Sequence, residues 1–352
     1  MNPAADTQVV YVAGGAGFLG SHLCRLFLDR GDRVVCIDNY STGFAVNLEA
    51  MIEHPRFAAV EHDITEPFDA NPALAALVAS EPPTRICNMA SPASPPTYHR
   101  LAIETLMVGS VGMRNLLELA VSTGARILQA STSEVYGDPD VHPQPESYWG
   151  HVNPIGPRSM YDESKRFAEA LCVTYARTRG VDVRLPRIFN TYGPGLSPDD
   201  GRVVTNFIAQ ALRGEPLTVY GDGMQTRSFC FVDDEVRGLG ALLDSDVQGP
   251  VNIGNPNEFT MLELALLVLE LTGSASVIEH LPLPGDDPLQ RQPDITRARV
   301  ELGWEPAVML REGLERTVAW FIRCRSSGPL LTPDVRIAAH AAGLGVLTWR
   351  GC

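Results

Sequence analysis

The chain has 352 residues, of which 45% are hydrophobic, and this suffices for two domains or for one large α/β unit with a smaller lobe. Its formal net charge of −14 argues against non-specific binding to nucleic acid or to an anionic membrane surface. Because no Cys-x-x-Cys pair, signal-peptide pattern or long uncharged apolar run is present, we expect a cytoplasmic protein with reduced thiols, no membrane span and no metal site.

The first predicted unit is a strand, a glycine-rich turn and a helix. Residues 9–13 are a short apolar strand, and residues 21–30 carry apolar side chains at helical spacing. The glycines between them follow a Gly-x-x-Gly-x-x-Gly pattern, which lets the backbone approach a pyrophosphate at the N-terminus of the helix. This arrangement predicts a dinucleotide-binding fold. The cofactor contacts predicted here are Gly14, Ala16, Gly17, Phe18, Leu19 and Gly20.

Two acidic residues lie at the ends of the next predicted strands, one directly after 34–37 and one within 60–64, where the strand runs into a loop. Asp38 is placed to accept hydrogen bonds from the adenosine ribose, and its carboxylate would repel a 2′-phosphate, which favours NAD over NADP. Asp63 is a candidate for the adenine amine, and a role as a helix-capping or loop residue is equally compatible with its position. Further predicted cofactor contacts are Asn39, Ser41, Thr42, Gly43, Ile64 and Ala90.

A proline-rich segment follows the fourth predicted strand, at 85–89. Three prolines within residues 92–96 fix φ and remove backbone donors, so we expect a rigid loop and not a helix. Ligands of open α/β sheets bind at the carboxyl ends of the strands, so this loop is expected to contact a ligand. A helix is predicted next, over 105–120.

Tyr161 and Lys165 share one face of a predicted helix, because positions i and i+4 are neighbours there. A nearby ammonium favours the phenolate, so the pKa of Tyr161 is expected to fall from its reference value of about 10. A tyrosine tuned in this way can take a proton from an alcohol near neutral pH. The pattern therefore predicts a dehydrogenase-type base.

Three polar residues end the fifth predicted strand, at 127–130. The hydroxyl of Thr132 can hydrogen-bond the alcohol from which Tyr161 removes a proton. Glu134 can move protons if its pKa is raised. Ser133 lies between them and is a poor general acid.

Together, the glycine turn, Thr132, Tyr161 and Lys165 resemble the extended short-chain dehydrogenase/reductase superfamily. Segments 90–95, 131–137, 153–166 and 225–227 narrow the resemblance to the UDP-glucuronate decarboxylases, or UDP-xylose synthases, over residues 9–321. This resemblance implies tightly held NAD+, a UDP-glucuronate substrate and a homodimer built on the two helices that flank the catalytic strand. It also implies oxidation at C4 of the sugar, loss of CO2 from C5 and return of the hydride to C4.

The resemblance also assigns roles to single residues. Thr132, Tyr161 and Lys165 take the dehydrogenase roles, and Glu134 handles protons near C4 and C5. Two arginines, Arg227 and Arg291, are expected to converge on the diphosphate. One departure is Gly109, where the resemblance leads us to expect an Asn that helps to hold the active-site helix. The implied substrate contacts are Ser91, Pro92, Tyr98, Glu134, Asn190, Arg202, Val204, Thr218, Tyr220, Arg227 and Arg291.

Two other functions stay open at this point. A related UDP-sugar 4-epimerase would use the same tyrosine and lysine, and a 4,6-dehydratase would too, although Ser133 replaces the acid that water expulsion needs. A non-catalytic NAD-binding regulatory module is the third possibility, and the intact set of Thr132, Tyr161 and Lys165 weighs against it.

The expected fold is a Rossmann-type doubly wound parallel sheet with a smaller, interleaved C-terminal lobe. The NAD-binding domain is predicted over 1–186, with 229–254 returning to it. The UDP-sugar-binding lobe is predicted over 187–228 and 255–325, and 326–352 is expected to be a tail of unknown order.

Overall fold

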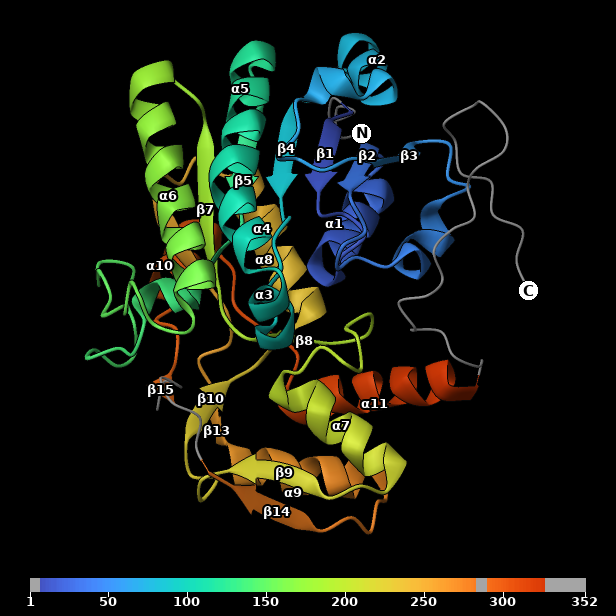
Figure 1. Cartoon of the computed structure of the whole chain (residues 1–352), viewed down its shortest axis with the longest axis vertical. Helices are drawn as coiled ribbons and strands as arrows, with labels where there is room; N and C mark the ends of the chain where they lie inside the picture. The colour runs from blue at the N-terminus through green and yellow to red at the C-terminus, as the bar shows by residue number, and fades with distance from the viewer. Residues whose placement is uncertain (1–6, 283–289, 327–352) are drawn as a thin grey trace.

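A parallel sheet forms the centre of the larger part of the molecule in the computed structural model, which describes residues 7–282 and 290–326 (Figure 1). The strand order is β12-β7-β5-β4-β1-β2-β3, so the chain runs outward in one direction from β1 and then in the other from β4. Ligands bind at such a reversal in open α/β sheets, and the expected doubly wound Rossmann-type sheet is confirmed. The strands are β1 (Val9–Ala13), β2 (Arg33–Asp38), β3 (Phe57–Glu61), β4 (Arg85–Asn88), β5 (Arg126–Gln129), β7 (Val183–Ile188) and β12 (Pro250–Ile253), and the short β6 (Ser131–Thr132) pairs with β7.

Helices cover both faces of this sheet, which explains why its strands are apolar on both sides. In β1, Val10 and Val12 pack on the face covered by α1 (Phe18–Asp29) and α8 (Val232–Asp244). Tyr11 packs on the opposite face, with α2 (Pro72–Ser80), α5 (Met113–Thr123) and α6 (Ser159–Arg179). Both α8 and β12 thus return to the large sheet after the chain has visited the smaller part.

The helix predicted over 105–120 is interrupted. It consists of α4 (Ala102–Met107), a π-helical turn (Val108–Gly112) and α5. Gly109 lies in the π-helical turn, where a Cβ atom would be 2.7 Å from the backbone oxygen of Ser164 in α6. The absence of a side chain therefore allows the turn to approach α6 closely, and an Asn would not fit this packing unchanged.

The proline-rich loop is shorter than predicted. Pro95 and Pro96 occupy the first turn of α3 (Pro95–Arg100). Proline is well suited to this position, because its missing N–H has no partner in the first helical turn. The prediction of a loop up to Pro96 is therefore wrong by two residues.

The smaller part of the molecule lies beyond the carboxyl ends of the large sheet's strands (Figure 1). It contains small sheets in which β9 pairs with β14, and β10 with β13 and β15. The strands are β8 (Thr191–Tyr192), β9 (Leu217–Tyr220), β10 (Thr226–Ser228), β11 (Cys230–Phe231), β13 (Glu258–Thr260), β14 (Ile278–Leu281) and β15 (Gln290–Arg291). Its helices are α7 (Val203–Arg213), α9 (Met261–Thr272) and α11 (Leu310–Ser326), whereas α10 (Thr296–Leu302) packs on α8 and β12 of the larger part. The 3-10 turns of the described residues are Ala45–Met51, Phe68–Ala70 and Ser133–Tyr136.

The predicted tail falls mostly outside the described residues, because α11 ends at Ser326 and 327–352 are not described. Within the described ranges, no helix is both long enough and apolar enough to cross a membrane.

Candidate active site

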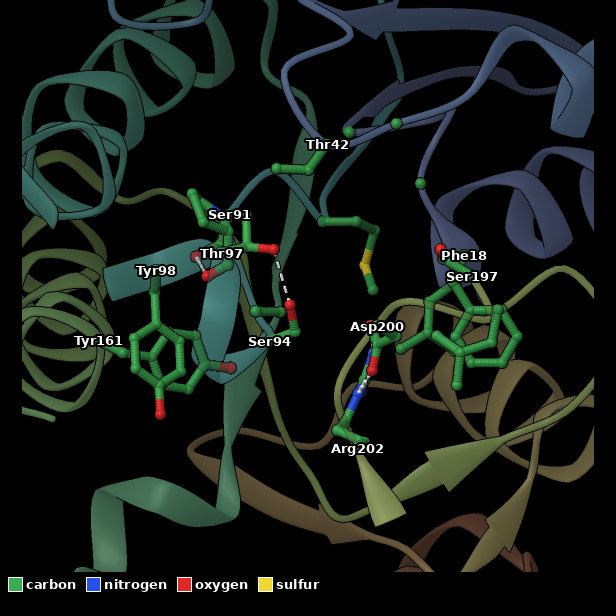
Figure 2. A pocket seen from close by; sticks show the side chains of 18 of the residues that line it. Phe18, Thr42, Ser91, Ser94, Thr97, Tyr98, Tyr161, Ser197, Asp200 and Arg202 are labelled. Carbon is green, nitrogen blue, oxygen red and sulfur yellow. Dashed lines mark hydrogen bonds and ion pairs between the residues drawn. The ribbon is translucent and has the colours of Figure 1, made fainter. Parts of the chain in front are cut away.

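A cavity of about 2180 Å³ lies at the carboxyl ends of the parallel strands and extends into the smaller part of the molecule. Ligand pockets commonly measure about 300–1,000 Å³, so this cavity has room for two ligands of nucleotide size. Every residue predicted to bind cofactor or substrate lines it, except Ala16. Figure 2 shows part of its wall, with the rings of Tyr98 and Tyr161 stacked on one side and Asp200 and Arg202 opposite them.

The glycine turn between β1 and α1 is packed too closely for side chains. Gly14 has a positive φ of 74°, and a Cβ atom there would lie 2.6 Å from the backbone nitrogen of Ala90. A Cβ atom at Gly20 would lie 2.0 Å from the carbonyl oxygen of Gly14. The α1 helix begins directly after this turn, and its N-cap, Gly17, supplies no side-chain acceptor to the first N–H groups. The turn and the helix end therefore fit a pyrophosphate.

Asp38 lies at the end of β2 and is buried. Its Oδ2 accepts a hydrogen bond from the Ala16 backbone N–H (2.9 Å), and its Oδ1 accepts one from the Tyr40 N–H (2.8 Å). Burial raises the pKa of this carboxyl group, and the hydrogen bonds from the backbone oppose that rise. The N–H of Ala16 is thus directed at Asp38, which explains why Ala16 does not line the cavity as predicted.

Asp63 follows β3 and also lines the cavity. Its Oδ1 accepts hydrogen bonds from the backbone and the hydroxyl of Thr65, and its Oδ2 accepts one from the amide of Asn39 (2.8 Å). Partial burial tends to raise the pKa of Asp63, but these hydrogen bonds outweigh it and lower the pKa. Asp63 therefore stabilises its own loop through these hydrogen bonds, which is the alternative that the sequence left open, and it lies beside the place predicted for the adenine.

The predicted catalytic residues come together at the start of α6 and the end of β6. The ammonium of Lys165 donates a hydrogen bond to the carbonyl of Ala130 (3.0 Å) and lies 5.8 Å from the centre of the Tyr161 ring. Burial lowers the pKa of Lys165 to about 8. Burial raises the pKa of Tyr161, and a hydrogen bond with Thr132 opposes that rise. The expected fall in the pKa of Tyr161 is therefore wrong for the protein without bound cofactor. Burial of the phenolate has a larger effect than the ammonium of Lys165, which lies 5.8 Å from the ring centre.

Glu134 is clamped between two arginines. Its Oε2 lies 2.8 Å from Nη2 of Arg158, and its Oε1 lies 3.0 Å from Nη1 of Arg291. Burial tends to raise the pKa of Glu134, but the two guanidinium groups outweigh it and lower the pKa. The condition for Glu134 to act as an acid, a raised pKa, is thus not met, and the group is an ionised carboxylate.

Arg291 belongs to this cluster through its guanidinium. Although it is paired in register with Arg227 across β10 and β15, its guanidinium points to Ser133 (3.0 Å), Glu134 and the carbonyl of Gly137 (2.9 Å). Its side chain is only 2% exposed. The convergence of Arg227 and Arg291 on the diphosphate stays a prediction, and both arginines line the cavity.

The sequence analysis assigned no role to Arg158 or Asp162. Arg158 follows Gly156 and Pro157 and lies directly before α6. Its positive charge, so close to Tyr161 in the sequence, could have indicated a role in the site. Asp162 is buried next to Tyr161, and among the described residues no hydrogen-bond partner reaches its Oδ1. Burial and the charge of Glu134 raise the pKa of Asp162 to about 7, opposed by Arg158 and Arg291. Nothing in the sequence indicated this carboxyl group as special.

The far wall of the cavity comes from the smaller part of the molecule. Arg202 forms an ion pair with Asp200 (Nη2 to Oδ1, 2.8 Å), and both line the cavity. Thr218 in β9 is held by the amide of Gln210, which accepts its N–H and donates to its hydroxyl. The other predicted substrate contacts on this wall are Asn190, Val204, Tyr220 and Arg227.

This arrangement defines what the site can do. One end can hold a dinucleotide, and the centre holds a phenol and a lysine that can remove a proton from an alcohol. Beside them lie two arginines, an ionised carboxylate and a carboxyl group that titrates near neutrality, a setting for an anionic substrate group. Within residues 7–282 and 290–326, no three His, Cys, Asp or Glu side chains are grouped so that they could hold a metal ion.

The model of the NAD-dependent epimerase/dehydratase family matches residues 10–254. UDP-glucuronic acid decarboxylase 5 of Arabidopsis thaliana is 54% identical over 306 residues, which are 87% of this chain and 86% of its own length. UDP-glucuronic acid decarboxylase 1 of Danio rerio is 50% identical over 318 residues, which are 90% of this chain and 73% of its own length.

Among solved structures, the chain is similar to UDP-glucuronic acid 4-epimerase from Bacillus cereus in complex with UDP-glucuronic acid and NAD. The TM-score is 0.79 at 27% sequence identity, and the match covers 90% of this chain and 99% of the epimerase.

Proposed function

The chain belongs to the NAD-dependent epimerase/dehydratase family, and on that premise we propose that it is an NAD-dependent UDP-glucuronate decarboxylase, which forms UDP-xylose and CO2. The relatives described above are named for that activity, and their similarity extends over most of this chain. The observation in the structure that supports this most is the cluster beside Tyr161. There, Ser133 stands next to Glu134 and accepts a hydrogen bond from Arg291.

The cofactor is NAD, and the glycine turn fits it, because Gly14 and Gly20 leave no room for a Cβ atom where the backbone closes on itself. Asp38 at the end of β2 fits the adenosine ribose and disfavours a 2′-phosphate. When bound, NAD+ supplies the hydride acceptor for C4 and a positive charge that favours the phenolate of Tyr161.

In the first step, Tyr161 removes the proton of the C4 hydroxyl as the hydride leaves C4. Thr132 hydrogen-bonds the same oxygen, and Lys165 supplies the cation behind the phenol. In the second step the bond between C5 and C6 breaks and CO2 leaves. The electron pair of that bond moves toward C4 and gives an enolate with its charge on the C4 oxygen. The hydrogen bonds from Tyr161 and Thr132 stabilise that charge. A proton is then added at C5 and the hydride returns to C4, so one proton is consumed overall.

Dehydration is the weaker alternative because it needs a protonated leaving group, and Ser133 is a poor acid. Epimerisation needs the keto sugar to turn over between the two hydride transfers. Two arginines that hold a sugar carboxylate would oppose such a rotation, so we assign Arg158 and Arg291 to the carboxylate side of the sugar. Glu134, which is ionised, orients these arginines and can accept a proton near C4 and C5.

The substrate is assigned to the part of the cavity that lies between the catalytic helix and the smaller lobe. The sugar lies near Ser91, Pro92 and Tyr98, and the UDP group lies toward the residues of the far wall, including Arg202 and Arg227. In support of this placement, the Bacillus cereus epimerase binds UDP-glucuronic acid and NAD in one complex.

We also propose that the protein is a cytoplasmic homodimer. Ile103 in α4 is 69% exposed, and Phe167 in α6 is 52% exposed. Leu106 and Met107 of α4 are also exposed, and Ile103 and Met107 lie at the edge of the cavity. Apolar side chains on two neighbouring helices suit a contact with a second copy. The six cysteines of the described residues are all unpaired, in keeping with a reducing compartment.

Mass spectrometry of the purified protein with UDP-glucuronate, without added NAD, tests the reaction. A product at the mass of a UDP-pentose is expected, because CO2 is lost and the cofactor is regenerated in each turnover. Conversion of UDP-glucuronate to an isomer of unchanged mass would instead establish a 4-epimerase.

A further inference from the structure

We propose that Gln144 is a positioning residue for this reaction, because it holds the chain segment that carries Arg291 against the catalytic strand. Gln144 lies in the long loop between the 3-10 turn at Ser133–Tyr136 and α6. It is fully buried, yet it is not among the residues that line the cavity. Its effect on the reaction is therefore exerted through other residues.

Gln144 binds the backbone on both sides of Pro293. Its N–H donates to the carbonyl of Gln292 (2.9 Å), and its side-chain Oε1 accepts the N–H of Gln292 (2.9 Å). Its own carbonyl accepts the N–H of Asp294 (3.0 Å). Three hydrogen bonds thus tie one residue to the two residues that flank Pro293, in the manner of a strand pairing with its neighbour.

This pairing matters because it adds a contact from the loop before α6 to those that the segment makes with β10, Ser228 and Pro256. Strand β15 is only two residues long, Gln290–Arg291, and lies at the edge of its small sheet with β10 on one side. Gln292 follows Arg291 directly, so the position of its backbone determines where the guanidinium begins. We infer that the Gln144 contact supplies the partner that β15 lacks on its outer side.

The same loop also contacts the guanidinium. The carbonyl of Gly137, at the start of the loop, accepts a hydrogen bond from Nη2 of Arg291 (2.9 Å). The loop therefore contacts the guanidinium of Arg291 through Gly137 and the backbone of the next residue, Gln292, through Gln144. Both contacts are needed to place Nη1 against Ser133 and Glu134.

Asn252 in β12 anchors this arrangement to the large sheet. Its side-chain N–H group donates to the carbonyls of Gln144 (2.9 Å) and Asp294 (3.0 Å), and its Oδ1 accepts the hydroxyl proton of Tyr136 (2.7 Å). Both partners of the Gln144 contact are thus fixed to one buried residue of the rigid sheet.

The chemistry of Gln144 is specific to an amide. Its oxygen accepts from Gln292, and its Nε2 donates to the carbonyl of Val141 (2.8 Å). A leucine of similar size would leave the N–H of Gln292 without its partner in a buried place, and such a loss is unfavourable. We therefore expect Gln144→Leu to loosen the segment around Arg291 without filling or emptying the cavity.

Chemical labelling tests the position of Arg291 without relying on activity. Phenylglyoxal modifies accessible arginines, and peptide mass spectrometry reports each site. In the full-length native protein, Arg291 and Arg184, whose side chains are 2% and 1% exposed, should both be protected. In Gln144→Leu, labelling of Arg291 should rise several-fold while Arg184 stays protected. Equal protection of Arg291 in both proteins would overturn the proposal.

Gln210→Leu is the matched control. Gln210 also accepts a backbone N–H, that of Thr218 (3.1 Å), but in α7 and away from Arg291. It should leave the labelling of Arg291 at the level of the native protein. If Gln144→Leu does not fold, as judged by thermal unfolding, Gln144→Asn replaces it, because its shorter amide cannot reach Gln292.

Kinetics test the consequence, which rests on the role proposed for Arg291. Gln144→Leu should lower kcat on the order of 10²-fold with a small change in KM, as misplacement of a catalytic group does. The double variant Gln144→Leu/Arg291→Ala should be no slower than Arg291→Ala, because Gln144 acts through Arg291. Multiplicative losses in the double variant would contradict this route.

The two experiments fail separately. If the native protein does not act on UDP-glucuronate, the proposed function is wrong, and the labelling result still decides whether Gln144 holds Arg291.

Discussion

Tyr161 and Lys165 lie one turn apart in α6, yet the ammonium donates to the carbonyl of Ala130 and not to the phenol. The neighbouring hydroxyl is that of Thr132, and the ring stacks on Tyr98 with centres 5.2 Å apart. The role proposed for Lys165 therefore combines its charge near the phenol with its hydrogen bond to the strand end at Ala130. The phenolate must be formed against the cost of burial, which makes the positive charge of the bound cofactor part of the mechanism.

Replacing Tyr161 by Phe removes the proposed base and little else. We expect kcat to fall by about 10³-fold, within the range for general acid–base catalysis, because the C4 proton has no acceptor. Stability should change by about 1 kcal/mol or less, the value of one hydrogen bond. Steady-state kinetics and thermal unfolding measure the two effects. The control is Tyr175→Phe, also in α6, which removes an exposed hydroxyl that donates a hydrogen bond to Glu118 of α5. Near-normal kcat in Tyr161→Phe would refute the assignment.

Asp162 should make stability depend on pH. Its pKa of about 7 in the folded protein lies above the reference of about 3.9, so between these values the folded state binds more protons than the unfolded state. The free energy of unfolding should then fall as pH rises through this window, by at most about 1.4 kcal/mol per pH unit from this group.

Asp162→Asn removes this contribution, and its free energy of unfolding should fall less between about pH 4 and pH 7 than that of the native protein. Urea unfolding at several pH values measures the difference. Asp69→Asn, at an exposed site on a 3-10 turn, controls for the loss of one charge. Parallel pH profiles for the native protein and Asp162→Asn would show that Asp162 is not the titrating group.

At the scale of elements, the junction of α4, the π-helical turn and α5 shows how a glycine sets the distance between helices. Gly109 lies against the backbone oxygen and Cβ atom of Ser164, one residue before Lys165. A side chain at position 109 would move this part of α6, and with it the lysine. Glycine in place of the expected Asn thus removes a side-chain amide, and it also allows the π-helical turn to pack closer to α6.

Gly109→Asn should therefore destabilise the protein in spite of the better helix propensity of Asn. Overpacking typically costs about 1–3 kcal/mol, more than the gain in propensity of a few tenths of a kcal/mol. A lower Tm by differential scanning calorimetry is the expected result. Ser110→Asn, at the next residue, where the side chain bonds only to the backbone of α4, should change Tm little. A higher Tm with faster turnover in Gly109→Asn would instead favour the view that the Asn is missing.

At the scale of the whole molecule, α6 covers the opposite face of the large sheet from α1 and α8, and both α4 and α6 carry exposed apolar side chains. The same helices hold the catalytic tyrosine and the lysine, so a contact with a second copy would also stiffen the active site. This link between assembly and catalysis depends on the homodimer that we propose.

Phe167→Asp places a charge in the middle of that contact. The native protein should have the mass of a dimer by light scattering, and Phe167→Asp should shift toward the monomer, because a buried unpaired charge is strongly unfavourable. Val300→Asp adds the same charge to α10 at a side chain that is 76% exposed, and it should remain a dimer. A monomeric native protein would contradict the proposal directly.

Local patterns in the sequence were sufficient to predict the parallel sheet and the wall of the cavity that the glycine turn and α6 form. The apolar run of β1, the glycine turn before α1 and the spacing of Tyr161 and Lys165 depend on residues that are close in the chain. Each of them acts through the geometry of a single strand, turn or helix. The division into a cofactor domain and a UDP-sugar lobe, with the boundaries predicted here, stays a prediction.

Only the tertiary structure decided the electrostatics of the catalytic cluster. Arg291 and Glu134 are 157 residues apart in the chain, and they meet because β15 returns to the end of the catalytic strand. Arginines from remote segments lower the pKa of Glu134 against the effect of burial, and burial raises the pKa values of Tyr161 and Asp162. A protonation state depends on the surroundings of a side chain in space, and the order of residues along the chain does not contain those surroundings until the chain has folded.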